Sequence, residues 1–217
     1  MRPVMILFAK APVAGRVKTR LAAEIGAARA AALHRAFVAD SIAKLKEFTD
    51  LADIELHTDI STDAWSELDV ARQVQTPGDL QLKLLHALGQ GLAAGRRQVI
   101  IFGSDSPTLP RAHVHKLLSS AADIALGPCE DGGYYAIACR RVHPEMFAGV
   151  AWSTSSVLEQ TERAARASGL SVERCALWYD VDAPEDLVRL RAEPELPPST
   201  RQALWNVAIG GSIETAS

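Results

Sequence analysis

Apolar and polar residues along this chain follow two periods, one typical of strands and the other of helices. Short apolar runs predict strands at residues 4–9, 53–58, 70–76, 98–102, 123–127, 132–138 and 171–178. Helical spacing covers residues 22–47, a short piece near Trp65, and residues 79–94, 110–120, 154–167, 183–191 and 199–206. This alternation predicts a doubly wound α/β domain, with ligands expected outside the carboxyl ends of the strands.

Length and composition set the domain organisation. The chain has 217 residues, of which 48% are hydrophobic, enough to bury the core of one large α/β domain. We expect that domain to span residues 1–209, followed by a flexible tail at 210–217. No apolar run approaches the roughly 18 residues of a membrane span, and the first run is too short for a signal peptide.

Net charge and cysteine content limit the kinds of binding partner and the cellular compartment that we expect. A net charge of −3 gives no support for a nucleic-acid partner. The three cysteines, Cys129, Cys139 and Cys175, are widely spaced and form no C-x-x-C pair. They predict reduced thiols in a cytoplasmic protein, and neither a disulfide framework nor a zinc site.

A basic loop follows the first predicted strand. The first twenty residues contain five basic groups and no acid, and four of the five lie at residues 10–20. Pro12 stiffens this loop, and Gly15 lets its backbone approach a ligand closely. Lys10, Lys18 and Arg20 supply charge next to the expected start of a helix. The arrangement favours phosphate binding over a solvated basic surface, although the glycines of a P-loop are absent.

Two acidic segments also follow predicted strands. Asp105 lies in a tight turn at residues 103–107, where it could hold a divalent cation or serve only as a turn or helix-cap residue. Asp180 and Asp182 alternate about Val181, so they are expected on the same face. Asp182 alone could be a helix N-cap, but three carboxylates together suit Mg²⁺.

A glycine-rich turn lies between these acids in the sequence. Gly132 and Gly133 precede Tyr134, so a substrate could lie against bare backbone, with Asp131 at the rim; the alternative is a simple hairpin. Further along, residues 152–154 open a predicted helix, where Trp152 is either a core residue or a substrate wall and Ser153 lies in the capping segment.

Taken together, cations on one loop and acids on two others predict a metal–polyphosphate site. Mg²⁺, or Mn²⁺ in its place, would bridge phosphate oxygens. Lys10, Lys18 and Arg20 would neutralise the charge that grows on the leaving phosphate. Such chemistry needs positioning and electrostatics more than a strong nucleophile.

Five motifs in order resemble a bacterial family of glycosyltransferase-like proteins, DUF2064. They are F-A-K-A-P-V-A-G-R-V-K-T-R-L (8–21), G-S-D-S-P (103–107), G-P-C-E-D-G-G-Y-Y (127–135), W-S-T (152–154) and D-V-D-A-P-E-D-L (180–187). The family is grouped with nucleotide-diphospho-sugar transferases and is similar to phospholactate guanylyltransferases and molybdenum-cofactor nucleotidyltransferases. The resemblance implies a GT-A type fold, with a mixed, mostly parallel sheet between helices.

The resemblance also implies roles for particular residues. Lys10, Pro12, Gly15, Lys18 and Arg20 would bind the nucleotide, Asp105 would bind the metal, and Asp180 and Asp182 would supply further metal ligands. Gly78 and Asp79 match a nucleotide-binding Gly-Asp-Leu-Gly segment that is usually followed by arginine. Here Gln81 and Lys83 follow instead, which replaces a planar guanidinium fork with a point charge.

Three functions remain open from the sequence. A nucleotidyltransferase would join a nucleoside triphosphate to a small-molecule acceptor, and the strongly basic loop favours it slightly. A glycosyltransferase would use a nucleotide-sugar donor, as the family's usual description suggests. A nucleotide-binding regulatory module without catalysis is the third, and the Gln81 and Lys83 departures are its support.

Overall fold

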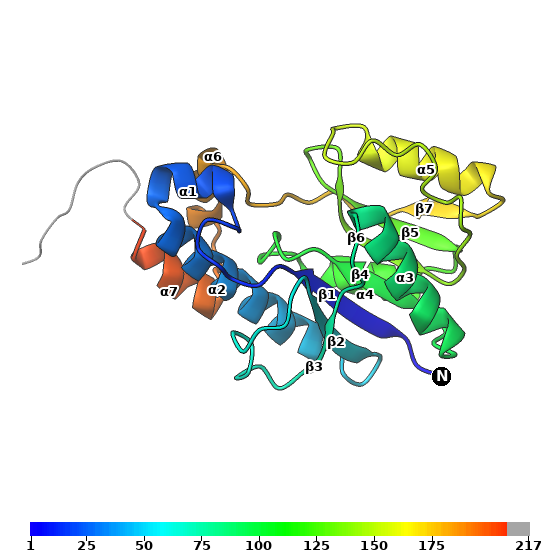
Figure 1. The fold of residues 1–217 in the computed structure, drawn as a ribbon, viewed down its shortest axis with the longest axis horizontal. Coiled ribbons are helices and arrows are strands. Elements are labelled where there is room, and N and C mark those ends of the chain that lie inside the picture. The colour runs from blue at the N-terminus through cyan, green and yellow to red at the C-terminus, as the bar shows by residue number, and fades with distance from the viewer. Residues whose placement is uncertain (208–217) are drawn as a thin grey trace, which may run out of the picture.

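A seven-stranded mixed sheet with helices on both faces organises the computed structural model, which describes residues 1–207 (Figure 1). The strands are β1 Val4–Ala9, β2 Asp53–Thr58, β3 Ala71–Val74, β4 Val99–Phe102, β5 Ile124–Pro128, β6 Tyr134–Cys139 and β7 Val172–Arg174. The helices are α1 Thr19–Ile25, α2 Ala27–Lys46, α3 Leu80–Ala93, α4 Arg111–Ser119, α5 Val157–Ala167, α6 Pro184–Arg191 and α7 Pro198–Trp205. The tail predicted at 210–217 lies outside the described residues.

The strand order places the predicted functional loops on one edge of the sheet. The order is β3-β2-β1-β4-β6-β5-β7, and β6 runs antiparallel to both β4 and β5 while the other pairs are parallel. Central β1 pairs with β2 and β4, so that Val4 lies opposite Asp53 and Val99. The chain therefore leaves β1, β2 and β4 at the same edge, where ligands of open α/β sheets bind.

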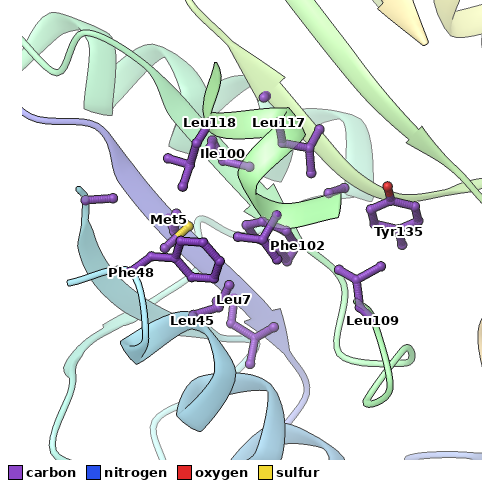
Figure 2. Close-up of a cluster of buried hydrophobic side chains, with 14 of the residues drawn as sticks. Met5, Leu7, Leu45, Phe48, Ile100, Phe102, Leu109, Leu117, Leu118 and Tyr135 are labelled. Atoms are coloured by element: carbon purple, nitrogen blue, oxygen red, sulfur yellow. The ribbon is translucent and has the colours of Figure 1, made fainter. Parts of the chain in front are cut away.

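Alternation along the central strands divides the core between the two faces of the sheet. Met5 and Leu7 of β1 point to the side covered by α2 and α4, and Figure 2 shows them beside Phe48, Ile100 and Phe102. The opposite set of β1 side chains packs beneath α3 and α5. All four residues of β4 are buried, as expected of a strand covered on both faces.

A separate helical cluster lies beyond the carboxyl edge of β1. It joins α1 and the first half of α2 to α6 and α7, which come from the end of the described chain (Figure 1). Leu21, Leu33, Phe37, Leu187 and Leu190 form its buried centre. Segments distant in sequence thus meet beside the loops that follow β1 and β4. No helix in residues 1–207 is long and apolar enough to cross a membrane.

The structure differs from the predicted elements at several boundaries. The single helix expected at 22–47 begins earlier and is broken at Gly26, whose φ of 85° and ψ of 148° are accessible essentially only to glycine. The short helical piece near Trp65 consists of turns. The last strand is shorter than predicted, although Trp178 still forms an isolated bridge with Cys129.

Candidate active site

Two side-chain and backbone contacts shape the loop that follows β1. The backbone N–H of Ala11 donates to Asp59 Oδ1 at 2.6 Å, which joins the loops after β1 and β2. A backbone bond from Arg16 N–H to the Val13 carbonyl then turns the chain, and Gly15 takes a φ of 79° within that turn. Lys10 is exposed before the turn and Arg20 is exposed after it, on the first turn of α1.

Lys18 lies at the end of this loop, as the N-cap of α1, and its side chain is only 3% exposed. Its Nζ contacts Asp105 Oδ1 at 2.5 Å and Asp182 Oδ1 at 2.7 Å, and donates to the Val181 carbonyl at 2.6 Å. Burial opposes the charge, but the two carboxylates together raise the pKa of Lys18 above its usual value. The ammonium group is therefore charged and enclosed by acceptors.

Asp105 follows β4, where its side chain and its backbone both connect distant loops. Burial alone would raise its pKa, but the adjacent Lys18 charge lowers it below the usual range, so the carboxylate is ionised. Its backbone carbonyl accepts a hydrogen bond from Val181 N–H at 2.8 Å. The loop after β4 is thus attached to the segment that carries Asp182.

Asp180 belongs to a different grouping from the other two predicted metal ligands. One ligand atom each from Cys129, Asp131 and Asp180 lie within 4.8 Å of one another. Burial raises the pKa of Asp180 to about 7, and the charges of Asp131 and Asp182 act in the same direction. Cys129 was not predicted here, because a thiol 51 positions earlier in the sequence forms no motif with Asp180.

The glycine-rich turn before β6 packs closely against the loop before α5. Asp131 Oδ1 accepts from the Gly133 N–H at 2.8 Å, and the Gly132 carbonyl accepts from Leu158 N–H at 2.9 Å. Gly132 has a φ of 88°, and a Cβ on it would overlap the backbone carbonyl of Ser155. Gly132 is therefore needed for this contact between loops, independently of any role in substrate binding.

The other residues predicted to contact substrate or nucleotide have local structural contacts. The hydroxyl of Tyr134 is buried in the core beneath α5, so it offers no exposed polar group. Trp152 packs against Phe147, and its Nε1 lies 3.5 Å from the Gln81 side-chain oxygen.

Two further predicted positions, Ser153 and Gly78, have positive φ values of 65° and 125°. Asp79 caps α3 by accepting the Leu82 N–H at 2.9 Å. The cap accounts for the start of α3 without a ligand, and the roles of Ser153, Gly78 and Asp79 in binding stay predictions.

A cleft of about 540 Å³ opens at this edge of the sheet. Its lining includes four predicted residues, Lys10, Lys18, Asp105 and Asp182. It also includes residues that the sequence patterns missed, among them His34, Asp59 and Gln75. A second cleft of the same volume lies elsewhere, between residues 143–149 and α5, and holds none of the predicted residues.

The missed residues differ in how far the sequence could have revealed them. Asp59 and Gln75 directly follow β2 and β3, and the rule that strand ends carry ligands could have found them. His34 lies inside α2, where nothing in the pattern marks it. Its Nε2 lies 2.9 Å from the Lys10 carbonyl, and burial lowers its pKa, so the neutral ring helps to hold the basic loop.

The donor set fits a hard divalent cation. The Lys18 Nζ marks a position that an oxygen of Asp105 and an oxygen of Asp182 reach together. Both carboxylate side chains remain about 40% exposed, at 40% and 43%, so phosphate oxygens and water could complete the coordination. A few carboxylates with phosphate and water are the ligands that Mg²⁺ prefers.

Comparison with solved structures identifies the fold. A protein from Desulfovibrio desulfuricans G20, described provisionally as a nucleotide-diphospho-sugar transferase, superposes with a TM-score of 0.86 and 29% identity over 95% of this chain and 96% of that one. A CMP:2-keto-3-deoxy-manno-octonic acid synthetase in complex with CTP superposes with a TM-score of 0.52 over 88% of this chain and 98% of its own, at 13% identity. The second likeness concerns the fold alone.

Comparison of sequences gives the family. A 2-phospho-L-lactate guanylyltransferase of Haloarcula marismortui is 30% identical over 114 residues, which cover 51% of this chain and 54% of that protein. The match thus spans about half the length of this relative. Residues 25–154 match the family described as "Uncharacterized protein conserved in bacteria (DUF2064)". The predictions of family and fold are confirmed: this chain belongs to the DUF2064 family and has the mixed α/β fold of the nucleotide-diphospho-sugar transferases.

Proposed function

We propose that this protein is a Mg²⁺-dependent nucleotidyltransferase that joins a nucleoside monophosphate unit to a small phosphorylated or sugar acceptor. The observation that carries the proposal is the convergence of Asp105 and Asp182 on one cation position, in a cleft bordered by the basic loop. Cations and carboxylates in one cleft suit a nucleoside triphosphate with its metal.

In this reaction an oxygen of the acceptor forms a bond to the α-phosphorus of the triphosphate while the bond to the leaving pyrophosphate breaks. Mg²⁺ held by Asp105 and Asp182 would supply Lewis-acid stabilisation of the phosphate oxygens. Lys10 is exposed and lines the cleft, where it can bind the negative charge of the departing pyrophosphate. Arg20 is exposed on the first turn of α1 and is not among the residues that line the cleft. The residues thus provide positioning and electrostatics, which dominate phosphoryl-type transfer.

The acceptor would lie towards the loops that precede β6 and α5. The turn at 130–133 and the segment at 152–155 pack on each other there, so together they can form a wall. Asp131 is exposed on this wall, and Asp180 is half-buried next to it. We assign the acceptor to this side because the basic loop, which suits polyphosphate, lies across the sheet edge from it.

Glycosyl transfer is the second candidate. The D. desulfuricans protein is described as a nucleotide-diphospho-sugar transferase, and it matches nearly the whole of this chain. The guanylyltransferase matches about half of this chain. A diphosphate-sugar with Mg²⁺ needs fewer protein cations than a triphosphate, so the number of basic residues at 10–20 supports nucleotidyl transfer.

Binding measurements separate the candidates. Calorimetric titration with the nucleoside triphosphates and common nucleotide-sugars, with and without Mg²⁺, should show metal-dependent binding of one triphosphate, and Asp105→Asn should abolish the metal dependence while staying folded. Preference for a nucleotide-sugar would favour glycosyl transfer. An unaltered metal response in the folded variant would mean that Asp105 is not a metal ligand.

A further inference from the structure

The ammonium group of Lys18 is enclosed by three oxygen atoms. Its Nζ donates to Asp182 Oδ1 and to the Val181 carbonyl at 2.7 and 2.6 Å, and it forms an ion pair with Asp105 Oδ1 at 2.5 Å, so three acceptors surround its three N–H groups. Its side chain is only 3% exposed, with the nitrogen 5.5 Å from the centre of the Phe37 ring. From this position Lys18 cannot contact a phosphate, so any such contact requires the ammonium to leave the carboxylates.

A metal ion would need the same oxygen atoms. The two carboxylates that hold Lys18 are the ones that fit a divalent cation, and each presents its Oδ1 to the ammonium. Two cations a few ångströms apart in a partly buried site repel strongly. The ammonium and the metal therefore compete for one position between Asp105 and Asp182.

The backbone conformation of Lys18 supports the same conclusion. Its φ of 46° and ψ of 46° lie in the left-handed region, which is unfavourable for a residue with a Cβ and persists where surrounding contacts hold it. The three contacts of the ammonium are such a restraint. Release of the side chain would remove this restraint on the loop between Gly15 and α1.

We propose that Lys18 is an exchangeable internal cation: it holds Asp105 and Asp182 together until the metal replaces it, and it then binds the nucleotide phosphates. This inference rests on the proposed function for the metal site and for the final step, but the competition for the carboxylates can be measured without nucleotide. It makes metal and nucleotide bind cooperatively, because each favours the same displacement of Lys18. Lys18 is therefore a positioning residue for the carboxylates before it is a phosphate ligand.

The experiment measures Mn²⁺ binding by electron paramagnetic resonance without nucleotide, in the wild-type protein and in Lys18→Met. Lys10→Met is the matched control, because Lys10 lines the same cleft but forms no ion pair with an aspartate within residues 1–207. Removing Lys18 should tighten Mn²⁺ binding by at least about tenfold, and removing Lys10 should change it less than about threefold. The affinity for a metal-bound triphosphate should instead fall roughly ten- to hundredfold in Lys18→Met.

Tighter Mn²⁺ binding together with weaker triphosphate binding in Lys18→Met distinguishes exchange from a purely structural role of Lys18. Unchanged or weaker Mn²⁺ binding in folded Lys18→Met, or an equal gain in Lys10→Met, would overturn the proposal. Circular dichroism checks folding, and Lys18→Gln, which removes the charge but keeps a donor, decides the matter if the methionine variant unfolds. Tighter Mn²⁺ binding in a protein that binds no nucleotide would support the exchange and refute the proposed function. Nucleotide turnover by the wild type, with unchanged Mn²⁺ binding in Lys18→Met, would support the proposed function and refute the exchange.

Discussion

At the residue scale, the position of the Lys18 ammonium group explains why the pKa values of Asp105 and Asp180 shift in opposite directions. Lys18 lowers the pKa of Asp105 through direct contact. Asp180 lies only two residues from Asp182, but its close neighbours are Cys129 and Asp131, which offer no positive charge. Burial and negatively charged neighbours therefore favour the protonated form of Asp180, whereas Asp105 stays ionised. Asp180 and Asp105 should thus gain their protons in different pH ranges.

Asp180 should make stability depend on pH. Its pKa is about 7 in the fold, whereas an unfolded aspartate ionises near pH 4. Between these values the folded chain keeps a proton that the unfolded chain has lost, so the free energy of unfolding falls as pH rises. Asp180→Asn should match the wild type at pH 4 and exceed it by about 1–2 kcal/mol at pH 8. Urea unfolding with a chelator measures this, and a pH-independent difference would contradict it.

Gly132 should tolerate no side chain. A Cβ there would overlap the Ser155 carbonyl, in addition to the strain of a φ of 88°. Gly149 has a similar φ of 73° but open space around it, so Gly149→Ala measures the strain alone, about 1–2 kcal/mol. Gly132→Ala should cost about 2–4 kcal/mol in urea unfolding, since the packing of two loops is lost as well. Equal costs in the two variants would show that the loops separate easily.

At the element scale, the short C-terminal helix depends on a residue from the long second helix. The buried side chain of Asp40 in α2 accepts the N–H groups of Ser199 and Thr200 at 3.1 and 2.6 Å, where α7 begins. A carboxylate satisfies the unpaired N–H groups of a helix start and interacts favourably with its dipole. Tertiary contact thus supplies a cap that the sequence near α7 does not.

Removing this cap should release α7 selectively. Asp40→Ala should lower the free energy of unfolding by about 2–3 kcal/mol, because a half-buried donor on Ser199 and a buried donor on Thr200 lose a charged acceptor. Hydrogen exchange should then speed up in residues 198–205 more than in β1 or β4. Asp40→Asn, which keeps one acceptor oxygen, should give a smaller effect. Uniform loss of protection across the chain would mean that α7 does not unfold separately.

At the scale of the whole molecule, the candidate site joins segments from almost the entire described chain. Its parts follow β1 and β4 and precede α6, and the bond from Val181 N–H to the Asp105 carbonyl connects the last two. A ligand that bridges these loops should stabilise the complete fold, because it binds the folded state and not the unfolded chain.

This stabilisation should require both metal and nucleotide. At about a hundred times its dissociation constant, a ligand contributes about 2.7 kcal/mol, which raises Tm by roughly 5–10 °C in a chain of this size. We expect the full shift with Mg²⁺ and the preferred triphosphate together, and little with either alone. Differential scanning calorimetry of the wild type and Asp105→Asn tests this. An equal shift in both proteins would place the ligand away from Asp105.

The sequence by itself determined the class of fold, the order of most elements, and three of the loops that carry the candidate site. Apolar runs with the period of a strand must be buried, and parallel strands bring their carboxyl ends to one edge. Residues 4–9 were predicted with the bounds that β1 has, and Asp105 was predicted at the edge where it lies.

Only the tertiary structure decided how these residues meet. Periodicity ignores φ, so it did not show the break at Gly26. It gave no reason to bury Lys18 between two acids 87 and 164 positions further along the chain, nor to group Asp180 with Cys129. Charges and hydrogen bonds act over a few ångströms in space, whereas a sequence pattern records separation along the chain, so the electrostatics of the site became visible only in the fold.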